Sequence, residues 1–588
     1  QRQARGGGLC PSACRMGCGG SRPEGDEATD QKINLDIDLD KLEKAQQQQQ
    51  DGLQAQDGKP AMESARITAS GYHTGLASDR PAFTQAFVHN HAGKKAGQEL
   101  EEKFDTSCGT TLGRGACGSV VAVRHRTTGE LYAMKVVSTE TVGGTLEELK
   151  REIEIQKALD HPNICKIFES FEDSRNKEIY IIMEICTGGS LVSRMKDHKH
   201  GYGERAAATL VEKILSSIIY CHHHGVVHRD IKLDNFIYEN ESEDSELKLI
   251  DFGFACEIAP GREAMWDQLG TPSYMAPELW SSSETEYDSS VDMWAIGVVT
   301  YMLLSGKRPF HHQDKKEKAR MIRHDPLRFP SPEWDKVSQE AKDFCSSLMQ
   351  KKPRDRLSAE ASKDHPWIKH ASNLHVGETA AEDLARHQEI VDSLTAFSEA
   401  DDLKKLALEV IAFETPPAKL DELRHLFVKM DVDDSGTISL QEFTDAMKLH
   451  PEVPADKLPQ IYQQMDVDHS GEVDYNEFLS ATLSAQKHST QSIMSAFNTL
   501  DADRDGFITK NDLVSALNGQ VSKTDIEAML KHADSSGKVS FSLFKRIVLS
   551  SMKQQTSSNP AEIVAEIANK ERRSSAEATP DDSRSVDA

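Results

Sequence analysis

Two segments of the chain place side-chain oxygens at the spacing of calcium ligands. Calcium is a hard cation that takes six to eight oxygen ligands, and a glutamate at the twelfth loop position can supply two of them. Gly436 permits the sharp turn of the first loop. The sequence therefore predicts calcium sites in loops 431–442 and 466–477. The predicted ligands are Asp431, Asp433, Ser435, Thr437, Ser439 and Glu442, then Asp466, Asp468, Ser470, Glu472, Asp474 and Glu477.

Two further repeats follow, so residues 420–551 hold four loops of the EF-hand pattern. The third loop, 501–512, ends in Asp512, which is shorter than glutamate. We expect this site to bind calcium more weakly or to tolerate magnesium; an acidic turn without a metal is the alternative. The fourth, 532–543, begins with His532 and ends with Leu543; it is predicted to bind none and to pair with the third. The third loop's predicted ligands are Asp501, Asp503, Asp505, Phe507, Thr509 and Asp512.

Helices must flank these loops, and a calcium sensor made of the four loops also needs a helix to bind as its target. Apolar residues precede the first loop at helical spacing, and EF-hand sensors expose such residues as a groove when calcium binds. In the junction, 369–419, an apolar stripe from Leu403 to Ile411 runs beside Lys404 and Lys405. A basic amphipathic helix of this kind is typical of a sensor's target. The alternative is a helix that only packs between domains.

A second chemistry begins with glycines that suit close approach to phosphates. LGRGACGSV carries Leu112, Gly113, Gly115, Gly118 and Val120. Glycine lets backbone lie against phosphate oxygens, although ordinary turns share this spacing. Lys135 follows in the apolar segment YAMK, and Glu152 lies in a helical pattern from 146 to 159 that can supply its ion-pair partner. A surface lysine is the alternative for Lys135.

The motifs that come next decide between these readings. HRDIKLDN spans 228–235, DFG spans 251–253 and APE spans 276–278. With the glycine loop and Lys135 before them, residues 104–368 resemble a eukaryotic-type protein kinase. The resemblance implies that Asp230 orients the substrate hydroxyl, Lys232 stabilises the transferring phosphoryl group, and Lys135 positions nucleotide phosphates. It also implies that Asn235 and Asp251 hold magnesium. Phosphoryl transfer needs such positioned charge more than covalent chemistry.

The kinase resemblance carries further residue roles. Ala133, Met183, Glu184 and Cys186 are expected to line the adenine pocket, although Met183 could equally be a core methionine. Lys232 is typical of serine/threonine kinases, and so is GTPSYMAPE, in which Thr271 is placed to contact Asp230 and Lys232. Asp292 and Arg356 resemble buried anchors, the second pairing with Glu278. Ser190 stands where related kinases that read a basic residue before the acceptor carry glutamate, so a basic preference is expected to be weakened.

The activation segment offers no residue that can be phosphorylated. Between Gly253 and Gly270 the chain contains no Ser, Thr or Tyr. Kinases with an arginine before the catalytic aspartate, here Arg229, often need a phosphate to balance its charge. We expect Asp267 to be the built-in acidic partner of Arg229. The alternative is a solvated surface aspartate.

Kinase, junction and four EF-hands in one chain resemble the calcium-dependent protein kinases of plants and protists. The implied fold is α+β and multidomain, a bilobal kinase followed by an all-α calmodulin-like domain of two EF-hand pairs. The implied ligands are ATP, Mg²⁺ and Ca²⁺, and the partners are protein substrates. The chain is expected to be a monomer. The junction and sensor would hold the kinase inactive until calcium binds. Two alternatives stay open: a kinase with structural hands, and a calcium-binding scaffold.

The two ends of the chain have a different composition. Residues 1–103, with glutamines at 46–50, and 552–588 are polar and predicted to be disordered. Met16 begins a myristoylation pattern, so we expect translation to start there, with lipid on Gly17 and Cys18 anchoring a cytoplasmic protein to membranes. A plain glycine-rich tail is the alternative. The net charge of −26 argues against nucleic-acid partners. The chain has no apolar run of membrane-spanning length, which argues against a transmembrane protein.

Overall fold

The computed structural model describes most of the chain between residues 89 and 550. The described residues are 89–93, 95–107, 109–115, 118–140, 146–258, 265, 269–280, 287–373, 381, 384, 388–483, 488–517 and 523–550. The predicted sites at Gly17, Cys18 and Asp267 lie outside them. No helix in these ranges is long and apolar enough to cross a membrane.

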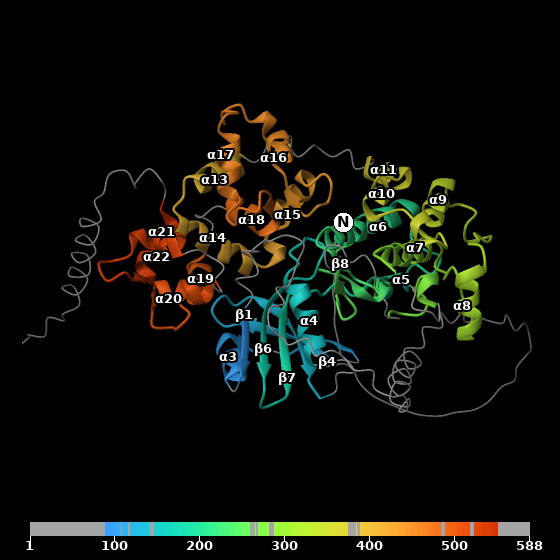
Figure 1. The fold of residues 1–588 in the computed structure, drawn as a ribbon, viewed down its shortest axis with the longest axis horizontal. Coiled ribbons are helices and arrows are strands. Elements are labelled where there is room, and N and C mark those ends of the chain that lie inside the picture. Colours follow the sequence, from blue (N-terminus) through green and yellow to red (C-terminus); the bar gives the residue numbers. More distant parts are fainter. Residues whose placement is uncertain are drawn as a thin grey trace, which may run out of the picture. The chain divides into compact units, whose positions relative to one another are not determined.

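A seven-stranded sheet forms the first layer (Figure 1). Its order is β1-β6-β7-β5-β4-β2, and β3 pairs with β4. Strands β3 and β4 pair in antiparallel orientation and form a hairpin that carries the glycine motif, with Gly115 opposite Gly118. Helix α4 packs against β6, so the sheet and helix share one apolar core. The elements are β1 His89–Gly93, α3 Ala96–Lys103, β2 Phe104–Asp105, β3 Thr111–Gly115, β4 Gly118–His125, β5 Leu131–Ser138, α4 Leu146–Lys157, β6 Ile167–Asp173 and β7 Glu178–Met183.

Residues 89–103 correct the predicted disordered extension, which was wrong for this stretch. β1 pairs in parallel with β6, and α3 buries Ala96 and Leu100 against the same core. His91 stacks on Phe171, with 4.4 Å between ring centroids. The sequence HNHAG of β1 has no apolar alternation, so its pairing depends on backbone hydrogen bonds to an existing sheet edge, which periodicity cannot reveal.

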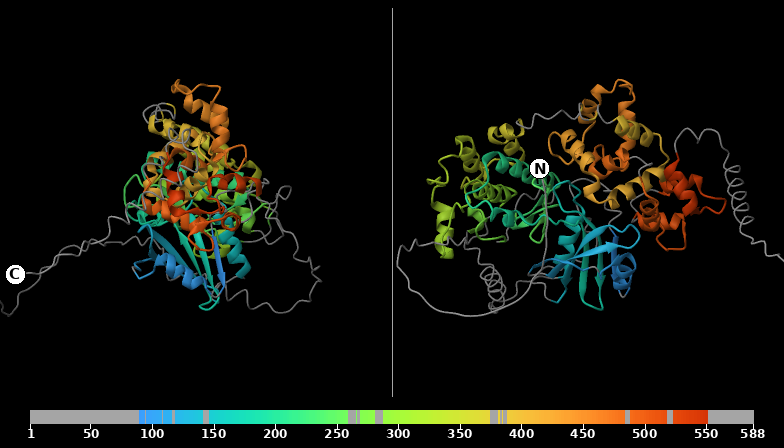
Figure 2. Two further views of the ribbon diagram at one scale, coloured as in Figure 1. Left: turned by 90° about the vertical axis from the view of Figure 1, so that its left-hand side faces the viewer. Right: turned by 180° about the vertical axis from the view of Figure 1, so that it is seen from behind.

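Helices dominate the second part of the chain, which Figure 2 shows in green and yellow. Helix α7 is buried on nearly every side, because its residues are apolar all round and it lies inside the largest core. The elements are α5 Leu191–Met195, α6 Glu204–His223, β8 Val226–Val227, η1 Leu233–Asn235, β9 Phe236–Tyr238, β10 Leu247–Leu249, β11 Cys256–Glu257, η2 Pro277–Trp280, α7 Ser290–Ser305, α8 Lys315–His324, α9 Gln339–Leu348, η3 Pro353–Asp355, α10 Ala359–Lys363 and α11 Pro366–Asn373.

The junction forms two helices where the sequence indicated one. Helix α13 spans Gln388–Ser398, α14 spans Asp402–Glu414, and a short turn, η4, covers Pro417–Lys419. The break falls at Glu399–Asp401, where polar residues interrupt the apolar pattern. Helix α14 carries the predicted stripe.

The sensor contains two pairs of helix–loop–helix units. Strand β12 pairs with β13, and β14 pairs with β15. The second pairing joins the third loop to the fourth, as predicted, although the fourth lacks calcium ligands at its ends. The elements are α15 Asp421–Met430, β12 Thr437–Ile438, α16 Leu440–Ala446, η5 Met447–Leu449, α17 Leu458–Met465, β13 Val473–Asp474, α18 Tyr475–Thr482, α19 Thr490–Leu500, β14 Phe507–Ile508, α20 Lys510–Ala516, α21 Lys523–Met529, η7 Leu530–His532, β15 Val539–Ser540 and α22 Phe541–Leu549.

Candidate active site and calcium-binding loops

Three predicted catalytic residues contact a fourth, Asp230. Thr271 donates to Asp230 Oδ1 from its backbone N at 3.0 Å and from its hydroxyl at 2.7 Å. Lys232 Nζ donates to Asp230 Oδ2, and Asn235 Nδ2 donates to the Asp230 carbonyl at 2.9 Å. These hydrogen bonds fix the Asp230 side chain, and one of its carboxylate oxygens lies beside the ammonium group of Lys232. This arrangement can orient a hydroxyl and offset negative charge on a phosphoryl group.

A second group of charges faces this cluster. Lys135 Nζ lies 3.7 Å from Glu152 Oε1, so the strand β5 and helix α4 are linked by the predicted ion pair. Desolvation favours the neutral form of Asp251, but the positive charges of Lys135 and Lys232 outweigh it and hold the pKa of this carboxyl below its ordinary value. Asp251 therefore carries a negative charge near the short helix η1, which contains Asn235. An ionised carboxylate and an amide oxygen are suitable Mg²⁺ ligands, and the magnesium would neutralise phosphate charge there.

The backbone beside Asp230 is held by a residue that the sequence indicated only as an anchor. Asp292 accepts from the backbone N of His228 at 3.0 Å and of Arg229 at 2.8 Å, and it also contacts His222 Nε2 at 3.0 Å. Arg229 has a positive φ of 65°, a strained conformation that these contacts support. Its side chain donates to the Phe254 carbonyl and the Tyr287 hydroxyl.

The other anchor and the nucleotide-side residues also have defined places. Arg356 and Glu278 form a two-pronged ion pair, with Nη1–Oε1 at 2.6 Å and Nη2–Oε2 at 2.7 Å. Ala133 on β5 lies opposite Met183 at the end of β7. Glu184 is buried and its carboxylate contacts Lys248 at 2.8 Å, so its side chain is held away from solvent. Cys186 is half-buried, and the glycine-loop residues Leu112, Gly113, Gly118 and Val120 lie on β3 and β4.

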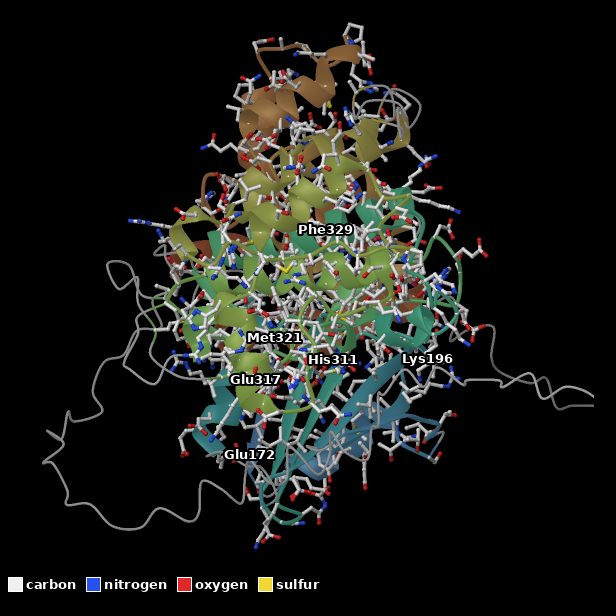
Figure 3. All side chains as sticks on the ribbon, turned by 90° about the vertical axis from the view of Figure 1, so that its right-hand side faces the viewer. Glu172, Lys196, His311, Glu317, Met321 and Phe329 are labelled. Atoms are coloured by element: carbon white, nitrogen blue, oxygen red, sulfur yellow. The ribbon has the colours of Figure 1, made fainter. Side chains whose placement is uncertain are left out.

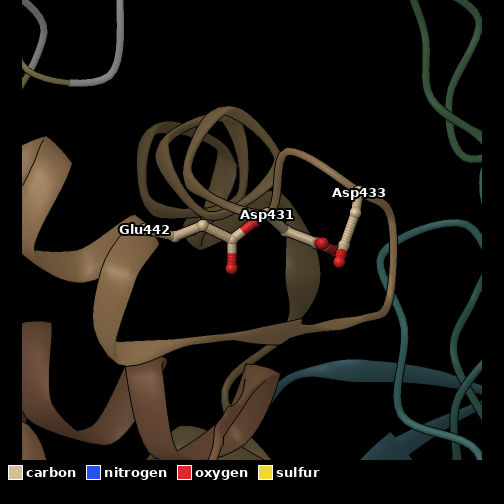
Figure 4. A group of neighbouring side chains, drawn as sticks. All are labelled: Asp431, Asp433 and Glu442. Atoms are coloured by element: carbon tan, nitrogen blue, oxygen red, sulfur yellow. The ribbon is translucent and has the colours of Figure 1, made fainter.

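The first two calcium loops gather the predicted carboxylates. Oxygens of the residues at positions one, three and twelve lie within 4.8 Å of one another in each loop. Figure 4 shows Asp431, Asp433 and Glu442 directed toward a common space. Burial, aided by the charge of Asp434, raises the pKa of Asp431 to about 8. Crowded acidic oxygens of this kind fit a divalent cation. Ser435, Thr437, Ser439, Asp466, Asp468, Ser470, Glu472, Asp474 and Glu477 lie in the same two loops.

The third loop gathers its carboxylates in the same way. Asp501, Asp503 and Asp512 offer oxygens within 4.8 Å of one another. Asp512 Oδ2 accepts from the Thr509 backbone N at 2.8 Å, as Glu442 Oε2 accepts from Ser439 at 2.9 Å in the first loop. The shorter side chain thus reaches the same capping position. Asp505, Phe507 and Thr509 occupy the remaining predicted ligand positions.

The junction helix α14 lies between the two halves of the sensor. Its residues from Lys405 to Phe413 are all buried. Leu406 and Val410 join a core that the second EF-hand pair shares with the β-sheet, whereas Leu408 and Ala412 join the core of the first pair. Helix α14 is therefore a buried helix packed on opposite faces, not a surface helix.

Buried polar contacts fix this helix in one register. Glu409 is fully buried and accepts from Asn476 Nδ2 at 2.8 Å and from Ser480 Oγ at 2.7 Å. Both donors lie on α18, beside the predicted calcium ligand Glu477. At the start of α14, Asp401 pairs with His532 at 3.0 Å, the first residue of the fourth loop. The single acidic residue within an apolar stripe was a signal that sequence reasoning missed.

The first calcium loop also packs against the catalytic domain. Asp434 contacts Ser216 on α6 and pairs with Lys363 at the end of α10, and Lys363 Nζ also donates to the Val432 carbonyl at 2.8 Å. Gly436 has a φ of 80°, and a Cβ atom there would lie 2.0 Å from the ring of Tyr220. Only glycine fits this contact.

A buried ion pair extends this contact surface. Arg424 on α15 lies 2.7 Å from Glu239, and both side chains are about 5% exposed. At the other end of the junction, Phe413 packs edge-on against Phe168 and the Tyr132 hydroxyl donates to the Glu414 carbonyl at 3.2 Å. No short motif marks any of these residues, so sequence reasoning could not have found them.

Comparisons with known proteins agree with this division of the chain. A family model of the protein kinase domain matches residues 107–368. A model of an EF-hand domain pair matches residues 420–483, and a model of a single EF hand matches residues 493–517.

Several curated relatives match a large part of the chain. Calcium-dependent protein kinase 14 of Arabidopsis thaliana is 35% identical over 373 residues, which cover 61% of this chain and 67% of the relative. Calcium-dependent protein kinase 25 of the same plant is 36% identical over 58% of this chain and 63% of the relative. Calcium-dependent protein kinase 20 of Oryza sativa subsp. japonica is 35% identical over 59% and 60%. With a catalytic cluster of kinase type and calcium loops in one chain, this protein belongs to the calcium-dependent serine/threonine protein kinases.

Proposed function

We propose that calcium switches this kinase on by stabilising the bound state of the junction helix α14. The observation that carries the proposal is the burial of α14 between both EF-hand pairs. Among the described residues, the contacts of the sensor with the catalytic domain include α3, α6, α10, Glu239 and Glu246, and no hydrogen bond or ion pair joins the sensor to Asp230. In this proposal, the cleft is open to substrate while the junction is bound.

The off state in this proposal is the one in which the junction leaves the sensor. Without calcium, the crowded carboxylates of the loops repel one another, which weakens the groove that holds α14. A released amphipathic helix must bury its apolar faces elsewhere, and the catalytic domain offers the surface. Calcium shifts this equilibrium only by its preference for the bound state.

The test is phosphorylation of a serine peptide by the full chain with magnesium and ATP, in calcium and in chelator. Faster turnover in calcium is expected. Equal rates would favour a kinase with structural hands, and no turnover in either condition would favour a calcium-binding scaffold. A Glu442→Gln/Glu477→Gln variant serves as the control that has lost its first two sites without altering the active site.

We also propose that the activation segment needs no phosphate. Its lack of Ser, Thr and Tyr supports this, as does a Lys135–Glu152 ion pair formed without one. Asp267 would balance Arg229. An Asp267→Asn variant should turn over more slowly in calcium, and unchanged turnover would refute this role.

Lipid attachment at Gly17 and Cys18 is a third proposal, supported by the pattern after Met16 and by the two-lipid requirement for stable anchoring. It would place a cytoplasmic kinase on membranes. Mass spectrometry of the native N-terminus tests it: a peptide running unbroken from residue 1 to 20 would contradict it.

A further inference from the structure

A concentration of positive charge stands out in this acidic protein. Residues 307–324 contain seven lysines and arginines against two acidic residues, in a chain whose net charge is −26. They form α8 and the loop before it. Helix α8 buries only Ala319 and Ile322 and exposes most of its cations. Figure 3 faces this side of the molecule, where Glu317 and Met321 mark the helix.

Three of these cations lie close together. Burial, together with the charges of Arg308 and Lys315, lowers the pKa of Lys318. Arg308 Nε is buried and has no hydrogen-bond partner among the described residues. In that part of the chain, no carboxylate forms an ion pair with any of the three, whereas Arg320 on the same helix pairs with Glu317 and Asp325. Like charges held near one another cost free energy, and an anionic ligand would offset this cost.

The cluster lies against the segment that follows the catalytic threonine. Lys318 Nζ approaches Ser273 Oγ at 3.4 Å, and Lys315 Nζ lies 6.0 Å from the centre of the Trp280 ring. Thr271, two residues before Ser273, donates to Asp230. A peptide whose hydroxyl reaches Asp230 therefore has its neighbouring residues within range of this segment.

The cluster and Ser190 lie on different elements near Asp230. Ser190, which stands where related kinases read a basic residue before the acceptor, bridges to Ile237 on β9. The cations instead lie on α8 and the loop before it, beside Ser273 and Trp280. A substrate that begins near Ser190 and crosses Asp230 continues toward α8, so the cations face residues that follow the acceptor.

We propose that Arg308, Lys315 and Lys318 recognise an anionic residue that follows the phosphorylated serine or threonine of the substrate. Aspartate, glutamate and phosphoserine share the required chemistry, because each accepts charge-assisted hydrogen bonds from such donors. The inference rests on the proposed function, since it names the substrate class of the same site. It predicts that the enzyme reads an acidic substrate residue after the acceptor, in addition to its weakened reading of a basic substrate residue before the acceptor.

The test uses the full chain in calcium and one set of serine peptides. Each peptide carries alanine, glutamate or phosphoserine at one of the first four positions after the acceptor. Binding is measured by fluorescence anisotropy with magnesium and ADP, so that no turnover is needed, and kcat and KM are measured with ATP. One glutamate at the best position should raise kcat/KM roughly tenfold, mainly through a lower KM. Comparing glutamate with phosphoserine distinguishes the two sources of negative charge.

Charge reversal provides the matched comparison. Lys315→Glu/Lys318→Glu should abolish the gain and favour a peptide with lysine at that position. Lys336→Glu changes an exposed lysine elsewhere in the same lobe and should keep the preference for glutamate.

The outcomes separate this inference from calcium switching. Equal binding of alanine and glutamate peptides overturns it, even in an enzyme that calcium activates. A preference that survives the double reversal, or an equal gain from glutamate placed before the acceptor, also overturns it. A preference for glutamate that the reversal removes supports the inference, whether or not calcium changes the rate.

Discussion

The carboxylate of Glu409 accepts a 2.8 Å hydrogen bond from the Asn476 side chain, joining the junction helix to the helix that carries the last predicted ligand of the second calcium loop. Asn476 is the residue directly before Glu477. The position of the junction and the position of a calcium ligand are therefore set by neighbouring residues of one helix. Buried polar pairs of this kind fix the register of packed helices.

Removing this pair should weaken the bound junction. Glu409→Ala removes one acceptor each from Asn476 and Ser480, which keep backbone carbonyl acceptors at Glu409 and Glu477, so we expect a loss of about 0.5–1.5 kcal/mol for each hydrogen bond. Glu409→Gln keeps an acceptor and should cost less. We expect the alanine variant to unfold at a lower temperature in calcium and to need more calcium for half-maximal turnover. Alanine and glutamine variants that behave alike would contradict a role for the hydrogen bonds.

Breaking the buried pair of Arg424 and Glu239 should loosen the contact between sensor and catalytic domain. Arg424→Leu leaves Glu239 without this partner, and breaking a buried ion pair costs about 3–5 kcal/mol when the charge cannot reach water. Separation of the sensor from the catalytic domain would let Glu239 reach water and reduce that cost. Amide hydrogen exchange should therefore increase in α15. Arg424→Leu/Glu239→Leu should restore protection. Exchange that stays slow in the single variant would count against a docked sensor.

The third calcium loop should respond to a longer carboxylate. Asp512→Glu lengthens the side chain at position twelve, which allows both oxygens to reach the ion. We expect tighter calcium binding at this loop by isothermal titration calorimetry. Leu543→Glu in the fourth loop is the matched control, because His532 still occupies its first position and no new site should appear. An Asp512→Glu protein with unchanged affinity would indicate that side-chain reach does not limit this loop.

The catalytic cluster predicts a loss of turnover without a loss of calcium binding. Asp230→Asn removes the negative charge that Thr271 and Lys232 contact, and loss of such a group lowers kcat by about 10²–10⁴-fold. Calcium titration should be unchanged. Asp244→Asn, which alters an exposed loop carboxylate, should keep full turnover. Comparable turnover rates for the two variants would contradict the role of Asp230 in orienting the substrate hydroxyl.

Acid should destabilise the catalytic domain through His161. Burial, with smaller effects from Lys248 and His224, lowers the pKa of this histidine to about 3, against about 6.5 in an unfolded chain. The unfolded chain therefore binds an extra proton below pH 6.5. This contribution to stability is complete above pH 6.5 and falls between pH 6.5 and 3, by up to about 1.4 kcal/mol per pH unit.

The measurement is chemical denaturation in chelator at several values between pH 7 and 5. His161→Asn can still accept from the Asn163 backbone N, which donates to the ring at 3.0 Å, but it cannot be protonated in this range. Its stability should fall less steeply with acid than that of the parent. Ser216 links His161 to Asp434, so the same comparison in an Asp434→Asn background separates the histidine from that carboxylate.

Short motifs explain how much of the site the sequence could predict. Asp230, Lys232 and Thr271 belong to compact signatures, so their convergence follows from recognising them; their roles in turnover stay predictions. The calcium loops are local in sequence, and their carboxylates meet as spacing indicated. The kinase fold followed by EF-hand pairs is likewise confirmed.

Contacts between distant segments could not be predicted in this way. The pairs Asp434–Lys363 and Arg424–Glu239 join residues that lie in unremarkable stretches, and nothing local distinguishes them from solvated charges. The strand at residues 89–93 is polar and depends on a sheet edge formed much later in the chain. The apolar residues of α14 predicted one buried stripe, whereas the helix is enclosed on opposite faces because two helix pairs share it.

Gly436 shows that one residue can belong to two functions that are usually altered separately. Its positive φ lets the first loop turn around its ligands, and its missing side chain lets the Tyr220 ring lie against the same backbone. A substitution at Gly436 intended to silence the calcium site would also push the sensor off the catalytic domain. Phenotypes of such a change would mix two causes, whereas Glu442→Gln, which leaves the tyrosine contact intact, isolates the ion.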